Sequence, residues 1–504
     1  MNIRQAKEYI KDCVRIYLKK DEFGEYRIPV VRQRPVFLLG APGIGKTAIM
    51  EQIAQELGIA LVSYSMTHHT RQSALGLPFI SRKQYDGEEY SVSEYTMSEI
   101  IASVYETMEE SGVKEGILVL DEINCVSETL APSMLQFLQY KVFGRHRVPD
   151  GWVVVTAGNP PEYNKSVREF DVVTMDRLKI LDVEADYKTW KEYAVEQGIH
   201  NAIINYLDIK KNHFYRIEAT MSGKTYVTAR GWEDLSQILQ LYEEEKLPVE
   251  EELVSQYIRN DKIAREFSAY YDLYQKYKRD YQIPQILMGQ ASESACERAR
   301  AAAFDERLSL LGMLLDTVQA EMKETVETAD YLKELMAPLK AVKALVADEG
   351  DGADPEKLLE AQAERLEKRM MSLKKANSLS KTEQKKQKRA IAFLRKAEKQ
   401  CAQNEAGMPV GFRPVEQLFN EETAQMKQHT MAVRERLHHL FAFVERVFED
   451  GNEMLILVTD LTVGEHSARF IGMFGCEDYA RHNEKLMLSE RRDELQEEIA
   501  ALEL

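Results

Sequence analysis

Gly40-Ala41-Pro42-Gly43-Ile44-Gly45-Lys46-Thr47 (GAPGIGKT) fits the pattern G-x-x-x-x-G-K-[ST], which forms a phosphate-binding loop. Glycines let backbone N–H groups surround phosphate oxygens, and the N-terminus of the following helix adds its positive dipole end. An apolar run, Pro35–Gly40 (PVFLLG), precedes the loop, and a helical pattern (TAIMEQIAQEL) follows it. The stretch therefore predicts a strand, a phosphate-binding loop and a helix in succession.

The side chains at the end of this loop suit a nucleotide and its metal ion. We expect Lys46 to reach the β- and γ-phosphates of ATP and the Thr47 hydroxyl to bind Mg²⁺. All residues from Gly40 to Thr47 are expected to line the nucleotide. The alternative is a chance match, which a chain of this length would show roughly one time in fifty at average residue frequencies. The flanking strand and helix favour the nucleotide site.

An acidic motif follows a second buried-strand pattern, at Gly116–Glu122 (GILVLDE). An apolar strand that ends in two acids places both carboxylates at the sheet edge where phosphates bind. We expect Asp121 to hold Mg²⁺ with Thr47, and Glu122 to accept a proton from the attacking water. Asp-Glu is also a common strand-to-turn transition, and its pairing with the phosphate-binding loop favours the catalytic interpretation.

Further apolar runs predict the rest of a parallel sheet. They alternate with helical patterns, as in α/β proteins whose sheet is covered on both faces. The additional predicted strands are Ala60–Met66, Gly151–Asn159 and Lys179–Ala185. The expected fold class is therefore α/β.

Composition restricts the class of protein. The chain has 504 residues, of which 30% are charged, and about three domains are expected at this length. No apolar run approaches the ~18 residues that cross a bilayer, so no membrane segment is expected. The five cysteines are far apart, which favours a reducing, cytoplasmic location over disulfides or a zinc site. A net charge of −17 argues against a surface that binds nucleic acid throughout.

These motifs resemble those of the AAA+ ATPases, and among them the MoxR-like family. The resemblance rests on GAPGIGKT, LVLDEIN (Leu118–Asn124), VVTAGNPPEYN (Val154–Asn164) and Asp176-Arg177, and it covers about residues 30 to 240. It implies an αβα sandwich with a small helical lid, ATP hydrolysis, and a homo-oligomeric ring that in this family is a hexamer. It also implies a protein client that is remodelled or activated, and a partner with a von Willebrand A-type domain.

The resemblance assigns roles to further polar residues. Asn159 would help to orient the lytic water; the alternative is a turn-forming residue before two prolines. Arg177 would reach the γ-phosphate of a neighbouring subunit, with Arg168 as its substitute; the alternative for Arg177 is a surface salt bridge. Arg230, in VTARGW, would act as the second sensor from the lid. The family usually has Ser-Pro-Arg there, and the alternative is an arginine that only starts a helix.

Two hairpins are also implied by the resemblance. Leu77–Tyr95, with a turn at Tyr85-Asp86-Gly87, resembles the hairpin inserted before the third strand in helix-2-insert members of the AAA+ class. Gly144–Gly151 (GRHRVPDG) resembles the second hairpin of these members, which precedes their sensor strand.

The second half of the chain has a different pattern. Apolar residues from Phe304 to Leu339 recur at the 4-3 spacing typical of a coiled-coil seam, and shorter runs follow at 359–373 and 433–447. Breaks at Ala347–Pro355 and Asn404–Pro414 separate three long helices. We expect these helices to pack as an antiparallel hairpin or bundle.

The patterns divide the chain into four segments. An apolar run at Met454–Thr459 predicts a short strand near the carboxyl end. The expected segments are an AAA+ nucleotide-binding core at 1–185, a helical lid at 186–250, a long-helix hairpin or bundle at 251–450, and a short strand with a helical tail at 451–504.

Two conspicuous surfaces remain. The aromatic residues spaced from Phe267 to Tyr281 suit a core stripe of a helix better than base stacking. The basic segment Arg365–Lys399 holds thirteen Lys or Arg against three Glu. A solvated helix face is the first interpretation of this segment, and an acidic protein partner or nucleic acid are the alternatives.

The sequence thus predicts an ATP-hydrolysing, ring-forming MoxR-like ATPase that acts on a protein client, with ATP and Mg²⁺ as cofactors. Two other classes of protein stay open. One is a nucleic-acid-dependent AAA+ motor that uses the basic segment, and the other is a slow nucleotide switch or scaffold. The presence of Lys46, Asp121 and Glu122 argues against the switch.

Overall fold

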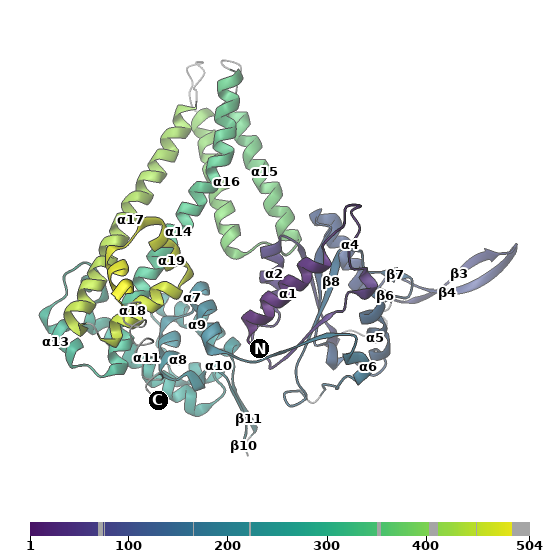
Figure 1. Ribbon diagram of the computed structural model, residues 1–504, viewed down its shortest axis with the longest axis horizontal. Helices are drawn as coiled ribbons and strands as arrows, with labels where there is room; N and C mark the ends of the chain where they lie inside the picture. Colours follow the sequence, from purple (N-terminus) through teal and green to yellow (C-terminus); the bar gives the residue numbers. More distant parts are fainter. Residues whose placement is uncertain are drawn as a thin grey trace, which may run out of the picture. The chain divides into compact units, whose positions relative to one another are not determined.

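The computed structural model describes residues 1–68, 74, 76–164, 166–220, 223–349, 354–402, 412–449 and 451–485. Contacts within the chain define two compact units. The first contains Met1–Thr189 and Ala363–Ile391, and the second contains Trp190–Gln362 and Ala392–Leu504. Figure 1 shows the helices and strands of both units. The predicted α/β fold with a long helical carboxyl-terminal region is confirmed, and the division into four segments stays a prediction.

A parallel sheet forms the centre of the first unit. Within the described residues it contains five strands in the order β2-β5-β8-β1-β9. Its strands are β1 (Val36–Gly40), β2 (Ala60–Ser65), β5 (Gly116–Asp121), β8 (Trp152–Gly158) and β9 (Lys179–Val183). Every sheet strand expected from the sequence is present. Because the strands are parallel, the carboxyl ends of β1, β5 and β8 meet at one edge.

Helices cover both faces of this sheet. One layer contains α1 (Ile3–Tyr17) and α2 (Ala48–Leu57), and the other contains α4 (Glu99–Ser111) and α5 (Ala131–Tyr140). A short helix, α6 (Val172–Met175), precedes β9. The arrangement is the expected αβα sandwich.

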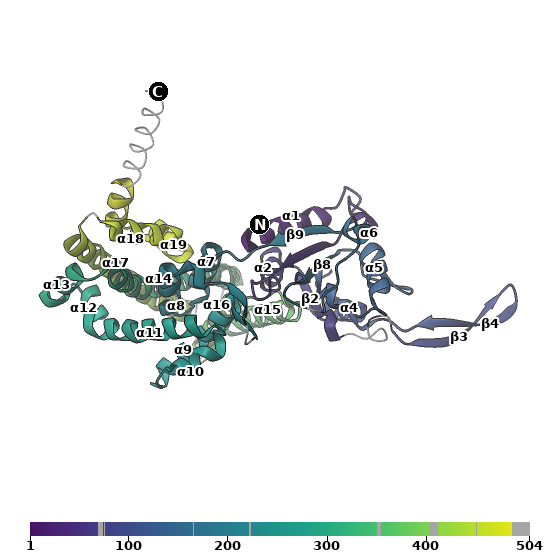
Figure 2. The ribbon, with the colours of Figure 1, turned by 90° about the horizontal axis from the view of Figure 1, so that it is seen from below.

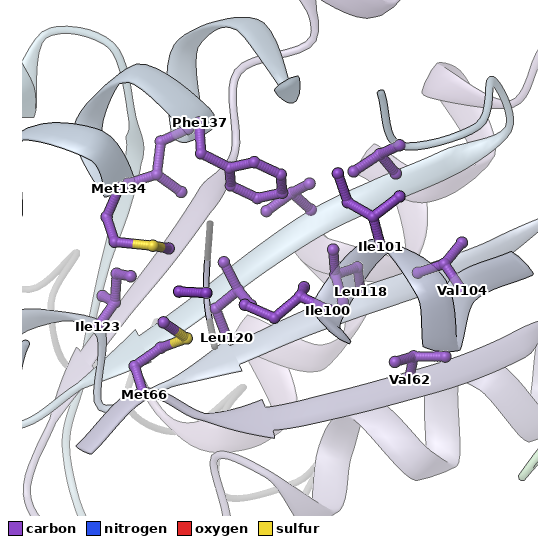
Figure 3. Packing of buried hydrophobic residues seen from close by; sticks show 14 of the residues in the cluster. Val62, Met66, Ile100, Ile101, Val104, Leu118, Leu120, Ile123, Met134 and Phe137 are labelled. Atoms are coloured by element: carbon purple, nitrogen blue, oxygen red, sulfur yellow. The ribbon is translucent and has the colours of Figure 1, made fainter. Parts of the chain in front are cut away.

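The main core of the first unit lies between the sheet and the layer of α4 and α5, where apolar side chains interlock (Figure 3). Leu118 and Leu120 of β5 belong to this core, whereas Ile117 and Val119 face the other layer, because alternate residues of a strand point to opposite sides. Strand β5 is thus buried on both faces, which explains its uninterrupted apolar sequence.

Two β-hairpins extend the first unit. β3 (Pro78–Tyr85) and β4 (Glu88–Tyr95) form a long hairpin that projects from the sheet (Figure 2). Its turn residues, Asp86 and Gly87, have φ of 51° and 87°, as a two-residue type I′ turn requires. The hairpin expected at Leu77–Tyr95 is therefore present. A smaller hairpin, β6 (Val142–Phe143) with β7 (His146–Arg147), begins just before the expected start at Gly144.

Helices of 5 to 21 residues and a hairpin follow, and all of them lie in the second unit except the first three residues of α7. They are α7 (Tyr187–Gln197), α8 (Asn201–Ile209), β10 (Arg216–Thr220), β11 (Gly223–Val227), α9 (Ala229–Glu244), α10 (Glu251–Tyr257), α11 (Asp261–Tyr281), α12 (Ile283–Leu287) and α13 (Glu293–Ala301). The ring of Phe267 packs edge to face on Tyr206 and Trp232, with centroids 5.3 and 5.4 Å apart. Tyr274 and Tyr281 of the same helix are buried as well. The aromatic stripe is core, as predicted.

Long helices follow. They are α14 (Phe304–Glu349), α15 (Pro355–Lys375), α16 (Lys381–Ala402) and α17 (Arg413–Phe448), with the shorter α18 (Asn452–Val463) and α19 (Glu465–Phe474) after them. The prediction of three long helices is wrong, because the segment expected as one helix between the two breaks contains both α15 and α16. The chain reverses at Asn377, whose φ is 52°, and the Ser380 hydroxyl caps the next helix at the Glu383 N–H, 3.0 Å away. None of the helices in the described part of the chain has the length and hydropathy of a membrane span.

Burial changes two other expectations for these helices. Beside the predicted seam residue Leu311, α14 buries Leu310, Met313 and Leu314, because it packs against α8, α11, α17 and α19. Its buried face is therefore broader than a coiled-coil seam.

The strand predicted at Met454–Thr459 is wrong, since this run is part of α18 and its buried positions have helical spacing. They are Met454, Leu457, Val458 and Leu461. Residues 350–353, 403–411 and 486–504, which include parts of the predicted breaks and tail, lie outside the described residues.

Phe137→Ala should loosen the first unit, because Phe137 is 0% exposed and stacks on Phe143 with ring centroids 4.1 Å apart. Removing a buried phenylalanine side chain costs about 3–5 kcal/mol. Hydrogen exchange of the β5 backbone amides, measured by mass spectrometry on the full chain, should become faster. Phe23→Ala, at a side chain that is 83% exposed, is the matched control and should leave this exchange unchanged. Equal exchange in the two variants would contradict the packing.

Candidate active site

The phosphate-binding loop connects the buried strand β1 to α2. Gly43 and Gly45 have φ of 73° and 94°, a region in which glycine is unstrained and other residues are not. A Cβ on Gly40 would lie 2.6 Å from the carbonyl oxygen of Val183, so strand β9 excludes a side chain there. The backbone therefore requires these glycines, and the loop leads directly to the N-terminus of α2, where anions bind.

The ammonium group of Lys46 lies inside this loop. The residue is only 9% exposed, and its Nζ donates to the carbonyl oxygens of Gly40 and Ala41, at 2.7 and 2.8 Å. Nζ also donates to Oδ1 of Asn159, 2.9 Å away, just after strand β8. The structure thus brings together two predicted site residues that are 113 positions apart.

Thr47 and Asp121 meet in the same region. The Thr47 hydroxyl donates to Oδ2 of Asp121 over 2.9 Å, and Oδ1 of Asp121 accepts the N–H of Glu122 over 2.8 Å. Asp121 ends β5 and Thr47 begins α2, so the contact follows from the common edge at which β1 and β5 end. A hydroxyl and a carboxylate side by side form a pair of oxygen ligands of the kind Mg²⁺ prefers.

The carboxylate of Glu122 is held by two hydroxyl groups that sequence reasoning missed. Its Oε2 accepts hydrogen bonds from Ser65 Oγ and Thr67 Oγ1, each at 3.0 Å. Glu122 has a φ of 55°, so the chain turns sharply after Asp121. This turn directs the side chain of Glu122 toward β2. The only signal in the sequence was the cluster of hydroxyl residues at and just after the end of the neighbouring strand, Ser63, Ser65 and Thr67.

Asn124 is a third residue that sequence reasoning did not single out. Its buried side-chain Nδ2 donates to the carbonyl oxygen of Asn159 at 2.8 Å, and its own carbonyl accepts the N–H of Arg168 at 2.9 Å. A Cβ on Gly158 would lie 2.5 Å from Asn124 Oδ1, so this glycine makes room for the contact. Asn124 therefore fixes the backbone that carries Asn159.

Cys125, just after the two carboxylates, responds to its surroundings. Burial, together with the negative charges of Glu122 and Asp121, raises the pKa of the Cys125 thiol above its ordinary value. The thiol is therefore kept protonated and stays neutral beside the two carboxylates.

The predicted arginines lie at the surface. Arg177, just after α6, has an exposed side chain. The exposed side chain of Arg168 pairs with Glu128 at 2.7 Å. Arg230 is exposed in the first turn of α9 and belongs to the second unit, whereas the loop belongs to the first.

The residues at this edge fit ATP and Mg²⁺. A buried ammonium group, a loop of glycines and a helix N-terminus suit the phosphates. Thr47 and Asp121 suit Mg²⁺, which usually binds through one or two protein groups together with substrate phosphates. The chemistry that these groups can support is phosphoryl transfer to water, with Glu122 as the proton acceptor.

Comparison with known proteins agrees with this geometry. Residues 35–178 match the family model described as AAA domain (dynein-related subfamily). The matched segment contains Gly40–Thr47, Asp121, Glu122, Asn159 and Arg177. No curated protein matched the chain. The domain match supports an AAA+ ATPase, and with it the binding of a nucleotide.

Lys46→Ala should weaken the binding of a non-hydrolysable ATP analogue by roughly 10- to 100-fold, because hydrogen bonds to charged groups contribute about 1.5–3 kcal/mol. Isothermal titration calorimetry with Mg²⁺ present measures the change. Lys114→Ala, at an exposed lysine of the same unit, is the control and should bind like the parent. Parent-like affinity in Lys46→Ala would show that the loop does not bind phosphates.

Proposed function

We propose that this chain is a ring-forming, MoxR-like AAA+ ATPase that hydrolyses ATP to ADP and phosphate and remodels or activates a protein client. The AAA domain match supports the ATPase class. The observation that carries the proposal is the convergence of polar side chains at one edge of the sheet. They are Lys46, Thr47, Asp121, Glu122 and Asn159.

Each of these residues has a role in the proposed reaction. Lys46 and the N–H groups of the loop bind the β- and γ-phosphates. Thr47 and Asp121 hold Mg²⁺, which offsets phosphate charge when bound. Glu122 accepts the proton of the attacking water, and Asn159 helps to orient that water. The hydrogen bond from Lys46 to Asn159 links phosphate binding to water positioning.

In this proposal a neighbouring subunit completes the site. Arg177 reaches the γ-phosphate of the adjacent copy, and Arg168 is its substitute. Both side chains are exposed in the single chain. A residue that acts on a neighbouring subunit needs such exposure, because its partner lies outside its own chain. Arg230 would serve as the second sensor. The hexamer and the client with a von Willebrand A-type domain rest on the resemblance to MoxR-like ATPases.

A nucleic-acid-dependent motor is the main alternative. Its candidate surface is the basic segment Arg365–Lys399, in which several cationic side chains form ion pairs with acidic residues of the same chain. Ion pairs among its described residues include Lys368–Glu364, Lys375–Glu110, Lys386–Glu383 and Arg395–Glu398. These pairs favour a solvated helix face over a phosphate-binding surface, and nucleic-acid binding would reveal itself by a steep salt dependence. A slow nucleotide switch is the other alternative. The presence of a candidate proton acceptor, Glu122, favours hydrolysis over such a switch.

We also propose a cytoplasmic location. All five cysteines lie within the described residues and are free thiols. A reducing compartment keeps thiols in this state.

Glu122→Gln should retain ATP binding and lower hydrolysis by at least ~100-fold, since only the proton acceptor is lost. Phosphate release under saturating Mg²⁺-ATP measures the rate, and calorimetry with the analogue measures binding. Glu109→Gln, at an exposed acid of α4, is the control and should hydrolyse like the parent. Turnover near the parent rate in Glu122→Gln would contradict the assignment of the base.

Arg177→Ala should hydrolyse ATP about 10³-fold more slowly at every protein concentration, at the low end of arginine-finger effects. Mixing it with Glu122→Gln protein should restore part of the activity, because a mixed interface pairs an intact Glu122 with an intact Arg177. Arg168→Ala, treated in the same way, tests the substitute. Rings shown by native mass spectrometry to be mixed, yet inactive, would argue against a role of Arg177 in trans.

A further inference from the structure

The turn between α15 and α16 binds the exposed edge of strand β2. β2 is the edge strand of the sheet, with β5 on its other side. The N–H of Leu61 donates to the carbonyl oxygen of Ala376 at 2.9 Å, and the carbonyl oxygen of Leu61 accepts from Asn377 Nδ2 at 3.2 Å. The turn thus satisfies both backbone groups that Leu61 presents at the open edge, although it lies more than 300 positions further along the chain.

Three further contacts hold this turn on the first unit. Ala376 is 0% exposed and belongs to the core beneath α4 and α5. The hydroxyl of Ser372 donates to the carbonyl oxygen of Ser111, at the end of α4. Lys375 pairs with Glu110 at 3.7 Å. Backbone, side-chain and apolar contacts therefore act together, and the turn is a built docking contact.

The same strand holds the proposed catalytic base. Ser65 ends β2, and its hydroxyl, with that of Thr67, donates to Oε2 of Glu122 at 3.0 Å. Leu61 and Ser65 are four residues, or about 13 Å, apart on one strand. Every second residue of a strand directs its backbone N–H and C=O groups to the same side. Leu61 and Ser65 therefore direct these groups to the same open edge of β2, which is the edge that the turn contacts.

We propose that the α15–α16 turn is a strap that restrains ATP hydrolysis by fixing β2. The inference rests on the proposed ATPase function. With β2 fixed, Ser65 and Thr67 keep their hydrogen bonds to Oε2 of Glu122, and these bonds hold the carboxylate on the side of β2. Releasing the strap lets β2 move and frees the carboxylate of Glu122 to turn toward the attacking water. Asn377 and Ser372 are positioning residues in this scheme, since they act through β2.

An edge strand needs cover in any case, because its free N–H and C=O groups would otherwise pair with other chains. Here the cover is carried by helices that continue along the chain into residues of the second unit, 355–362 and 392–402. An event at residues 355–362 therefore has a continuous helical path along α15 to Lys375, next to the Ala376 carbonyl that binds Leu61, whereas α16 begins at Lys381 after the turn. Energetic coupling between these helices and Glu122 needs an element with two discrete arrangements. In the proposal these are the docked turn and the released turn.

The test loosens the strap without touching the nucleotide loop. Asn377→Gly with Ser372→Ala removes both side-chain contacts, and glycine keeps the positive φ of residue 377. The control, Lys374→Ala with Lys381→Ala, changes exposed cations of the same turn. Hydrogen exchange at Leu61 should rise in the loosened variant only. Its kcat for ATP should rise about 5- to 30-fold, the range for one to two lost hydrogen bonds of about 1 kcal/mol each, with KM unchanged.

A second comparison separates the strap from general loosening. Ser65→Ala with Thr67→Val removes the groups that hold Glu122, so loosening the strap in this background should add nothing to kcat. Faster exchange at Leu61 with an unchanged or lower kcat would overturn the proposal, and so would a strap effect that persists without the two hydroxyls. If Asn377→Gly with Ser372→Ala fails to bind the ATP analogue, Ser372→Ala alone serves for the same comparison.

The failure of the strap and the failure of the ATPase function give different results. A parent chain that hydrolyses ATP through Glu122, with a loosened variant of equal rate, rejects the strap and keeps the function. A parent and a loosened variant that both lack hydrolysis reject the function, and the strap falls with it. If the parent shows no hydrolysis and the loosened variant does hydrolyse ATP, the result supports both the strap and the ATPase function.

Discussion

A buried ammonium group must be surrounded by oxygen atoms, and the arrangement of Lys46 depends on this requirement. Its Nζ finds two carbonyl oxygens of its own loop and the side chain of Asn159 beyond strand β8. The contact is available only if β8 lies beside β1 and both strands run in the same direction. The same parallel edge brings Asp121 to Thr47. Solvation of one lysine, strand order and the position of the acidic residues are therefore parts of one arrangement.

Contiguous features were predictable from the sequence because each has a local physical cause. Strands such as β5 are buried on both faces, so they appear as unbroken apolar runs. The loop from Gly40 to Thr47 is defined by glycines that the backbone requires and by one lysine. Asp121 and Glu122 follow a strand directly, and Asp86-Gly87 supplies the turn of a hairpin.

Contacts between distant segments were not predictable where no motif marks the residues involved. Ser65 and Thr67 are ordinary hydroxyl residues until the fold places Glu122 against them, and Asn124 is defined by its contact with Asn159. The strand predicted at Met454–Thr459 failed for another reason. Six apolar or β-branched residues suit a strand and a buried helix equally, and the helical spacing is visible only when the window extends to residue 461.

The edge strand β2 shows why the nucleotide-binding unit cannot be delimited by sequence position alone. Patterning assigns residues 363–391 to the long helices, yet they group with the sheet, because Ala376 completes its core and covers the backbone of Leu61. A segment that ended before these residues would leave that edge unpaired. The compact unit around Lys46 is thus discontinuous in the chain. The ends of α15 and α16 are structural parts of that unit, so whatever displaces them necessarily alters the edge of the sheet that carries Ser65.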